Sequence, residues 1–210
     1  MESTTPNDPA ESERLLVAAA GGDQGALRCL LEMHRGRLRR MVALRLDSRV
    51  AARVDASDVV QEAMFDAARK LADYERNRPL AFYPWLHRLT ADRLADVHRL
   101  HRRQGRDVAR EECAEADASS WLLADRLVAA DTTPGMAMVR EEQHRRVRSA
   151  LAELAPRDRE VLVMRHIEDL SVGEIAAILD ISESAVKMRH LRAIERIREV
   201  LERYSPGSSS

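Results

Sequence analysis

The stretch SVGEIAAILDISESAVKMRHLRA, residues 171–193, decides how the second half of the chain folds. Its first four residues form a Ser-x-x-Glu capping box, which starts a helix. The corner Asp180-Ile181-Ser182 follows, in which aspartate tolerates left-handed backbone and serine caps the next helix. The sequence therefore predicts two short helices joined by a tight corner.

This corner is typical of a helix-turn-helix, which needs a small residue where the helices cross and apolar residues to hold the angle. Ala176 can be the small residue. The apolar residues are Ile175, Leu179, Ile181 and Val186. Polar and basic residues crowd the start of the second helix, where a recognition helix meets bases and phosphates. They are Ser184, Lys187, Arg189, His190 and Arg192.

A plain amphipathic hairpin with a solvated basic face is the alternative interpretation. Apolar residues of the second helix recur at helical spacing in either case, at Ala185, Met188, Leu191, Ile194, Ile197 and Leu201. The combination of capping box, small residue, short corner and basic helix start favours DNA reading over the hairpin.

The composition of the whole chain favours helices. Aromatic residues make up 3% of the 210 residues, and glycine and proline number 8 and 7. Ala, Leu, Arg and Glu dominate together with Val, and most of these residues lose little on entering a helix. We expect an all-α fold of two small helical domains joined by a flexible acidic linker.

The pattern along the chain divides it into five parts. We expect a disordered tail over 1–12, a first helical domain over 13–107, an acidic linker over 108–133, a second helical domain over 134–204 and a tail over 205–210. The polar, acidic N-terminus is unlike a secretory leader, and no apolar run approaches the roughly 20 residues that span a bilayer. These features predict a cytoplasmic protein without membrane contact.

Charge is segregated along the chain although the net charge is only −1. Residues 35–53 carry seven arginines against one acid, and residues 88–110 carry seven against three. Acidic residues gather at the N-terminus and in the predicted linker. Separate basic blocks of this kind indicate surfaces that face phosphate.

A polar stripe runs along the predicted helix DASDVVQEAMFDAARKL, residues 55–71. Its members recur at helical spacing, and they are Asp58, Gln61, Glu62 and Asp66. The stripe fits a solvated face or a docking surface for a partner's helix, and both stay open on this segment alone. An enzyme site is a weaker alternative, because the stripe has no histidine at ligand spacing, no glycine-rich phosphate loop and no zinc-spaced cysteines beside it. We expect no catalytic residues, metal or cofactor.

The segment FYPWLHRLTADRLADVHRLHRR, residues 82–103, combines aromatic rings with an arginine row. Phe82 and Trp85 are expected to anchor the domain core. Arginines beside aromatic residues suit single-stranded nucleic acid. A solvated basic face is the alternative, and for the arginine row we favour nucleic acid.

Taken in order, these motifs resemble the extracytoplasmic-function sigma factors of bacterial RNA polymerase. LLVAAAGGDQGAL, RLDSRVAARVDASDVVQEA and FYPWLHRLTADRLADVHRLHRR are similar to sigma region 2. ALAELAPRDREVLVMRHIEDLSVGEIAAILDISESAVKMRHLRAIERIREVL is similar to sigma region 4. The resemblance covers nearly the whole chain and implies a promoter-specificity subunit that is not itself an enzyme.

The resemblance also implies partners and site residues. The partners are core RNA polymerase, through the clamp helices of its largest subunit and the flap of its second largest, and promoter DNA, with an anti-sigma factor as a further candidate. The residues implied in core binding are Asp58, Val59, Gln61 and Glu62. Those implied at the −10 element are Arg88, Asp92, Arg99, Arg102 and Arg103. Those implied at the −35 element are Ser184, Lys187, Met188, Arg189 and Arg192.

Three positions depart from the family pattern. Asp92 replaces a usual asparagine and places a negative charge near DNA, while Ala185 and Met188 replace a usual threonine and serine. Met188 cannot donate a hydrogen bond, so it either touches a thymine methyl group or packs in the core. A free-standing helix-turn-helix regulator is the alternative function, but it would have no use for a docking helix and a melting element.

Overall fold

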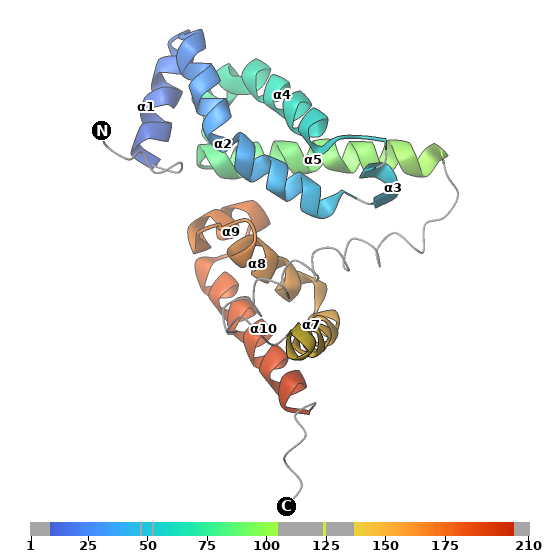
Figure 1. Ribbon diagram of the computed structural model, residues 1–210. Coiled ribbons are helices and arrows are strands. Elements are labelled where there is room, and N and C mark those ends of the chain that lie inside the picture. Colours follow the sequence, from blue (N-terminus) through green and yellow to red (C-terminus); the bar gives the residue numbers. More distant parts are fainter. Residues whose placement is uncertain (1–8, 47, 52, 105–123, 125–136, 204–210) are drawn as a thin grey trace, which may run out of the picture. The chain divides into compact units, whose positions relative to one another are not determined.

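The computed structural model describes residues 9–46, 48–51, 53–104, 124 and 137–203 (Figure 1). Within these ranges every regular element is a helix, as expected for an all-α fold. The helices form two compact units, residues 1–108 and 109–210. No helix in the described part of the chain combines the length and apolar character needed to cross a membrane.

In its described residues the first unit has five helices. They are α1 (Pro9–Ala20), α2 (Gln24–Arg45), α3 (Ser48–Ala51), α4 (Ala56–Asn77) and α5 (Phe82–Gln104). Helix α2 packs against α1, α4 and α5, and α4 also packs against α5 (Figure 1). The core between them is closed by large aliphatic side chains that are fully buried, namely Leu16, Leu30, Leu38, Met41 and Leu86.

Helix α1 begins earlier than the sequence predicts, because residues 9–12 are helical and do not belong to a tail. Proline at the first helical position has no N–H to satisfy and is already set to the helical φ, and Glu11 in the first turn suits the positive end of the helix dipole. The Ser12 side chain also reaches the His34 ring of α2 at 3.2 Å. The first turn is therefore held by α2 as well as by its own sequence.

Side chains at both ends fix the span of α4. Asp55 caps its start, accepting a hydrogen bond from the Ser57 backbone N–H at 2.6 Å. Arg78 ends the helix in the left-handed conformation, with φ 35°. Its guanidinium pairs with Glu75 of α4 and with Glu13 of α1. The residue that stops α4 thus also ties this helix to α1.

The second unit contains α7 (Ala137–Ala152), α8 (Pro156–His166), α9 (Val172–Leu179) and α10 (Glu183–Arg203). Helix α10 packs against the other three (Figure 1). The core of this unit includes large aliphatic side chains that are fully buried, among them Leu151, Leu162, Leu170 and Ile175. Three predicted parts lie outside the described residues: the linker apart from Ala124, the first residues of the second domain and the C-terminal tail.

Candidate functional sites

The corner between α9 and α10 has the hydrogen bonds that its sequence predicts. Ser171 Oγ accepts from the Glu174 N–H at 3.1 Å, and Glu174 Oε2 accepts from the Ser171 N–H at 2.8 Å, which completes the capping box. Asp180 takes the left-handed conformation, with φ 55° and ψ 49°. Ser182 Oγ then accepts from the Ala185 N–H at 3.1 Å. Backbone geometry and caps therefore fix the turn between the two helices.

Apolar contacts hold the angle of this corner. Ile175 and Ala176 are the buried residues of α9, and Val186 is the buried residue nearest the start of α10. Ala176 is 8% exposed, so a longer side chain there would have to displace the groups packed around it. The arrangement is that of a helix-turn-helix in which α10 occupies the position of a recognition helix.

The buried face of α10 differs from the apolar stripe expected from the sequence. The side chains that face the core are Val186, Ala193, Ile197 and Val200. Met188 and Leu191 are instead 54% and 48% exposed. Because each residue turns the helix by about 100°, both side chains fall outside the face centred on Val186 and Ala193. Met188 therefore points to solvent, which answers the question that the sequence left open between core packing and a surface role.

Three of the five residues assigned to the −35 element share one exposed strip. Ser184, Met188 and Arg192 recur every four residues, and all three are exposed. Lys187 is exposed beside this strip, whereas Arg189 is half-buried on the other flank. The structure thus brings four of the five into a solvent-facing surface at the start of α10.

The two cations of this surface also contact carboxylates of their own unit. Lys187 Nζ lies 3.8 Å from Glu183, and Arg192 Nη2 lies 3.8 Å from Asp158 of α8. Both cations are exposed, whereas Asp158 is only 18% exposed, and ion pairs with an exposed cation at 3.8 Å contribute little free energy. A DNA phosphate can therefore replace either carboxylate at small cost.

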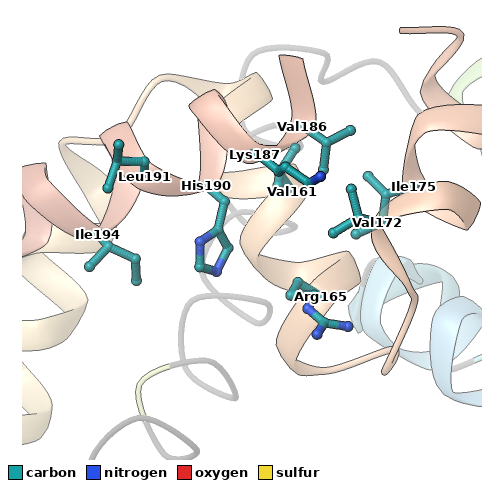
Figure 2. A pocket seen from close by; sticks show the side chains of 9 residues that line it. All are labelled: Val161, Arg165, Val172, Ile175, Val186, Lys187, His190, Leu191 and Ile194. Carbon is teal, nitrogen blue, oxygen red and sulfur yellow. The ribbon is translucent and has the colours of Figure 1, made fainter. Parts of the chain in front are cut away.

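An apolar hollow of about 380 Å³ lies among α8, α9 and α10 (Figure 2). Its apolar walls are Val161, Val172, Ile175, Val186, Leu191 and Ile194. Basic groups from Arg165, Lys187 and His190 also line it. A groove of this chemistry fits the apolar face of a helix that carries acidic residues along its edge.

A pair of histidines joins α8 to α10 beside the hollow. The Nε2 atoms of His166 and His190 are 3.0 Å apart, and the two rings stack with centroids 5.2 Å apart. Burial lowers the pKa of His190, and the charge of nearby Arg165 lowers it further. The sequence gives no sign of this pair, because the residues are 24 positions apart and depend on helix packing to meet.

The polar stripe on α4 is exposed except at Asp66, which is half-buried. Asp58, Gln61 and Glu62 face solvent, but Val59 is 1% exposed. Val59 follows Asp58 by one helical step, which turns it onto the core face beside Val60. The prediction that Val59 belongs to a partner-binding surface is therefore corrected: this side chain supports the helix from within.

Phe65 lies on the exposed side of α4 and was missed at the level of sequence. The residue is 63% exposed, although its side chain is large and apolar. The spacing could have found it, since Phe65 follows Gln61 by four residues and Glu62 by three.

Glu62 also forms an ion pair with Arg93 of α5. Both side chains remain partly exposed, at 51% and 38%. The stripe of α4 and the basic helix α5 are thus in direct contact, which no sequence pattern indicates.

The arginine row of α5 is only partly placed on the surface. Arg99 and Asp92 are exposed, and Arg99 pairs with Asp96, whereas Arg88 is half-buried. Arg102 and Arg103 fall within the helix, but their side chains lie outside the described part.

Of the rings at the start of α5, Phe82 and Tyr83 are buried in the core, whereas Trp85 is half-buried at its edge. The Trp85 ring centroid lies 4.4 Å from that of Tyr74 and 5.7 Å from that of Phe82. One arginine of the first basic block is structural as well, since Arg37 is buried with its guanidinium carbon 3.7 Å from the Tyr83 ring centroid. The positive guanidinium of Arg37 above the face of the Tyr83 ring stabilises the core.

Comparison with protein families matches both units. The family model for sigma-70 region 2 matches residues 30–106, and that for sigma-70 region 4 matches residues 144–197. The first match covers α4 and α5, and the second covers the helix-turn-helix.

Curated relatives are similar along most of the chain. The ECF RNA polymerase sigma factor SigD of Mycobacterium tuberculosis is 30% identical over 199 residues, which cover 93% of this chain and 87% of SigD. The RNA polymerase sigma factor CnrH of Cupriavidus metallidurans is 29% identical over 198 residues, covering 93% and 97%. A solved structure of CnrH in complex with the cytosolic domain of CnrY matches with a TM-score of 0.56 and 26% identity, covering 93% of this chain and 99% of CnrH.

Proposed function

The chain belongs to the sigma-70 family as an extracytoplasmic-function sigma factor, and we propose that its two units divide the contacts with core RNA polymerase and promoter DNA between them. Its function is to direct RNA polymerase to promoters for transcription initiation. A free-standing regulator is not favoured, because the relatives match both units and not the helix-turn-helix alone. The protein acts in the cytoplasm together with RNA polymerase, and the polymerase catalyses RNA synthesis.

The −35 element is read by α10 of the second unit. The exposed strip of Ser184, Met188 and Arg192, with Lys187 beside it, supports this assignment, because it stands on a capped helix-turn-helix. Arg192 and Lys187 supply phosphate or base contacts, and Met188 supplies an apolar contact to a thymine methyl group. Arg189, half-buried at the flank, contacts the backbone beside the groove.

The −10 element is melted and held by α5 of the first unit. The exposed Arg99 and the row that continues to Arg102 and Arg103 support contacts to phosphates of a single strand. Arg88 is half-buried near the aromatic start of the helix, so its role is to orient that part of α5. Asp92 is exposed on the same helix. Its negative charge repels phosphates and so keeps the DNA backbone away from this position.

Core polymerase is bound by the exposed face of α4. Asp58, Gln61 and Glu62 present one carboxylate, one amide and a second carboxylate over little more than one turn. A face of this kind fits basic and polar side chains on the clamp helices of the largest subunit. The exposure of all three residues, in a unit that matches region 2, is the observation that carries the proposal.

The hollow of the second unit is a second docking surface for the polymerase. Its apolar walls and basic rim fit an amphipathic helix with acidic residues, and we assign it to the flap of the second-largest subunit. Because CnrH is solved in complex with the cytosolic domain of CnrY, an anti-sigma factor is a further partner proposed for this chain.

Retention of core polymerase by tagged full-length protein tests the main proposal. The wild type is expected to retain it, and the double variant Asp58→Ala with Gln61→Ala is expected to lose most of it. Run-off transcription with the reconstituted holoenzyme then checks promoter use. Undiminished retention by the double variant would assign core binding to another surface.

A further inference from the structure

Phe65 is exceptional among the aromatic residues that the structure describes. Phe82, Tyr74 and Tyr83 are buried, whereas Phe65 is 63% exposed. A phenylalanine this exposed gains little from burial in its own unit, because most of its surface stays in water. Exposed aromatic rings of this kind are enriched where proteins meet their partners.

The position of Phe65 on α4 is central to the proposed polymerase-docking face. At about 100° per residue, Phe65 falls between Gln61 on one side and Asp58 and Glu62 on the other. The core side chains of α4 occupy the opposite side, as Val60, Ala63, Ala67 and Leu71. Phe65 thus stands in the middle of the solvent face and cannot turn into the core without rotating the helix.

Polar and charged side chains surround this ring. Asp58, Gln61, Glu62 and Arg69 are all exposed on the same side of α4. An apolar group at the centre of a polar rim is the arrangement in which a single side chain dominates binding energy, because the rim excludes water from the contact.

We propose that Phe65 is the apolar anchor of the contact between α4 and core RNA polymerase. It inserts between side chains of a polymerase helix whose basic residues face Asp58 and Glu62. The inference rests on the proposed docking role of α4 and replaces Val59 with Phe65 as the apolar member of that surface. Core polymerase is the occupant because Phe65 is continuous with the polar residues assigned to it.

Competition binding to core polymerase tests the inference with the full-length chain. Each variant competes with a fluorescently labelled wild-type chain for core enzyme, and the midpoint gives its relative affinity. Phe65→Ala is expected to weaken binding at least about tenfold, as for an aromatic anchor, while Phe65→Leu keeps most of it. Val17→Ala is the matched control, since Val17 is an apolar residue 57% exposed on α1.

Folding is checked by circular dichroism and thermal melting, which a substitution at an exposed position leaves close to the wild type. The double variant Asp58→Ala with Gln61→Ala is measured in the same assay. If the double variant loses binding while Phe65→Ala does not, the proposed docking face on α4 is supported and the anchor role of Phe65 is wrong. If neither variant loses binding, both proposals fail together.

If Phe65→Ala loses binding while the double variant keeps it, the anchor role of Phe65 is supported. Asp58 and Gln61 are then not needed for the contact with polymerase. A self-association that Phe65→Ala abolishes, with core affinity unchanged, would assign the ring to a second copy of the chain and overturn the inference. Size-exclusion chromatography of the free protein gives this readout.

Discussion

Glu62 of α4 and Arg93 of α5 form an ion pair that joins the proposed polymerase-docking face to the proposed DNA-melting helix. The two residues are 31 positions apart in the chain. In the proposed arrangement polymerase binds beside Glu62 and promoter phosphate beside Arg93, so we expect each partner to loosen the same intramolecular contact. The pair therefore lies where the two proposed binding events meet.

Breaking this pair should affect stability only slightly. Both side chains are more than a third exposed, and exposed pairs contribute about 0.2–1 kcal/mol. Urea unfolding of Glu62→Ala, Arg93→Ala and the double variant gives the coupling energy. We expect it to stay below about 1 kcal/mol. A coupling well above that value would make the pair a structural tie between α4 and α5.

Arg192→Ala should weaken transcription from cognate promoters while leaving core binding intact. Arg192 is exposed on the proposed DNA-facing strip, and its contact with Asp158 is long at 3.8 Å. Loss of one phosphate contact should also reduce the salt dependence of DNA binding by about one unit in slope. Arg198→Ala is the control, because Arg198 is exposed farther along α10. Equal losses of core binding and transcription by Arg192→Ala would indicate a structural role.

Mild acid should destabilise the second unit through His190. Burial and Arg165 lower its pKa below the ordinary value of 6.5, so the unfolded chain takes up a proton before the folded chain does. The stabilising contribution of neutral His190 is fully present above pH 6.5 and is lost as the pH falls from there through the folded-state pKa. Urea midpoints measured between pH 8 and pH 5 give the profile.

His190→Gln should flatten this pH profile, since glutamine does not titrate and still hydrogen-bonds. His101→Gln is the comparison variant, because His101 is a histidine of the other unit. An unchanged slope in His190→Gln would mean that other groups cause the acid sensitivity.

Met188→Ser should leave stability unchanged and alter promoter preference. At 54% exposure the side chain contributes little to the core, so the free energy of unfolding should change by less than about 0.5 kcal/mol. Ile197→Ser, at a position 7% exposed on the same helix, should cost about 2–5 kcal/mol by comparison. Run-off transcription from promoters varied at single −35 positions reports the change in preference. A large loss of stability in Met188→Ser would contradict the exposed placement.

Local sequence determined the helix-turn-helix corner almost completely. The capping box of Ser171 and Glu174, the left-handed Asp180 and the cap of Ser182 all depend on neighbours within four residues. Such contacts involve only neighbouring residues, so the residue types in the sequence are enough to predict them. The same holds for the all-α class and for the start of α4 at Asp55.

Helix faces were harder to predict, because periodicity defines a stripe without saying which stripe is covered. On α10 the apolar pattern included Met188 and Leu191, yet the face against α7, α8 and α9 is centred on Val186 and Ala193. On α4 the motif suggested Val59, but the helix turns Val59 inward and Phe65 outward. Packing against neighbouring helices selects the buried face.

The sequence by itself determined the family, the two helical units and the corner that presents α10, because these follow from short-range patterns in fixed order. Only the tertiary structure decided that Glu62 meets Arg93, that His166 meets His190 and that Phe65 stays in solvent. The physical reason is the same in each case: contacts between residues far apart in the chain depend on how whole helices pack, and no local pattern encodes that arrangement.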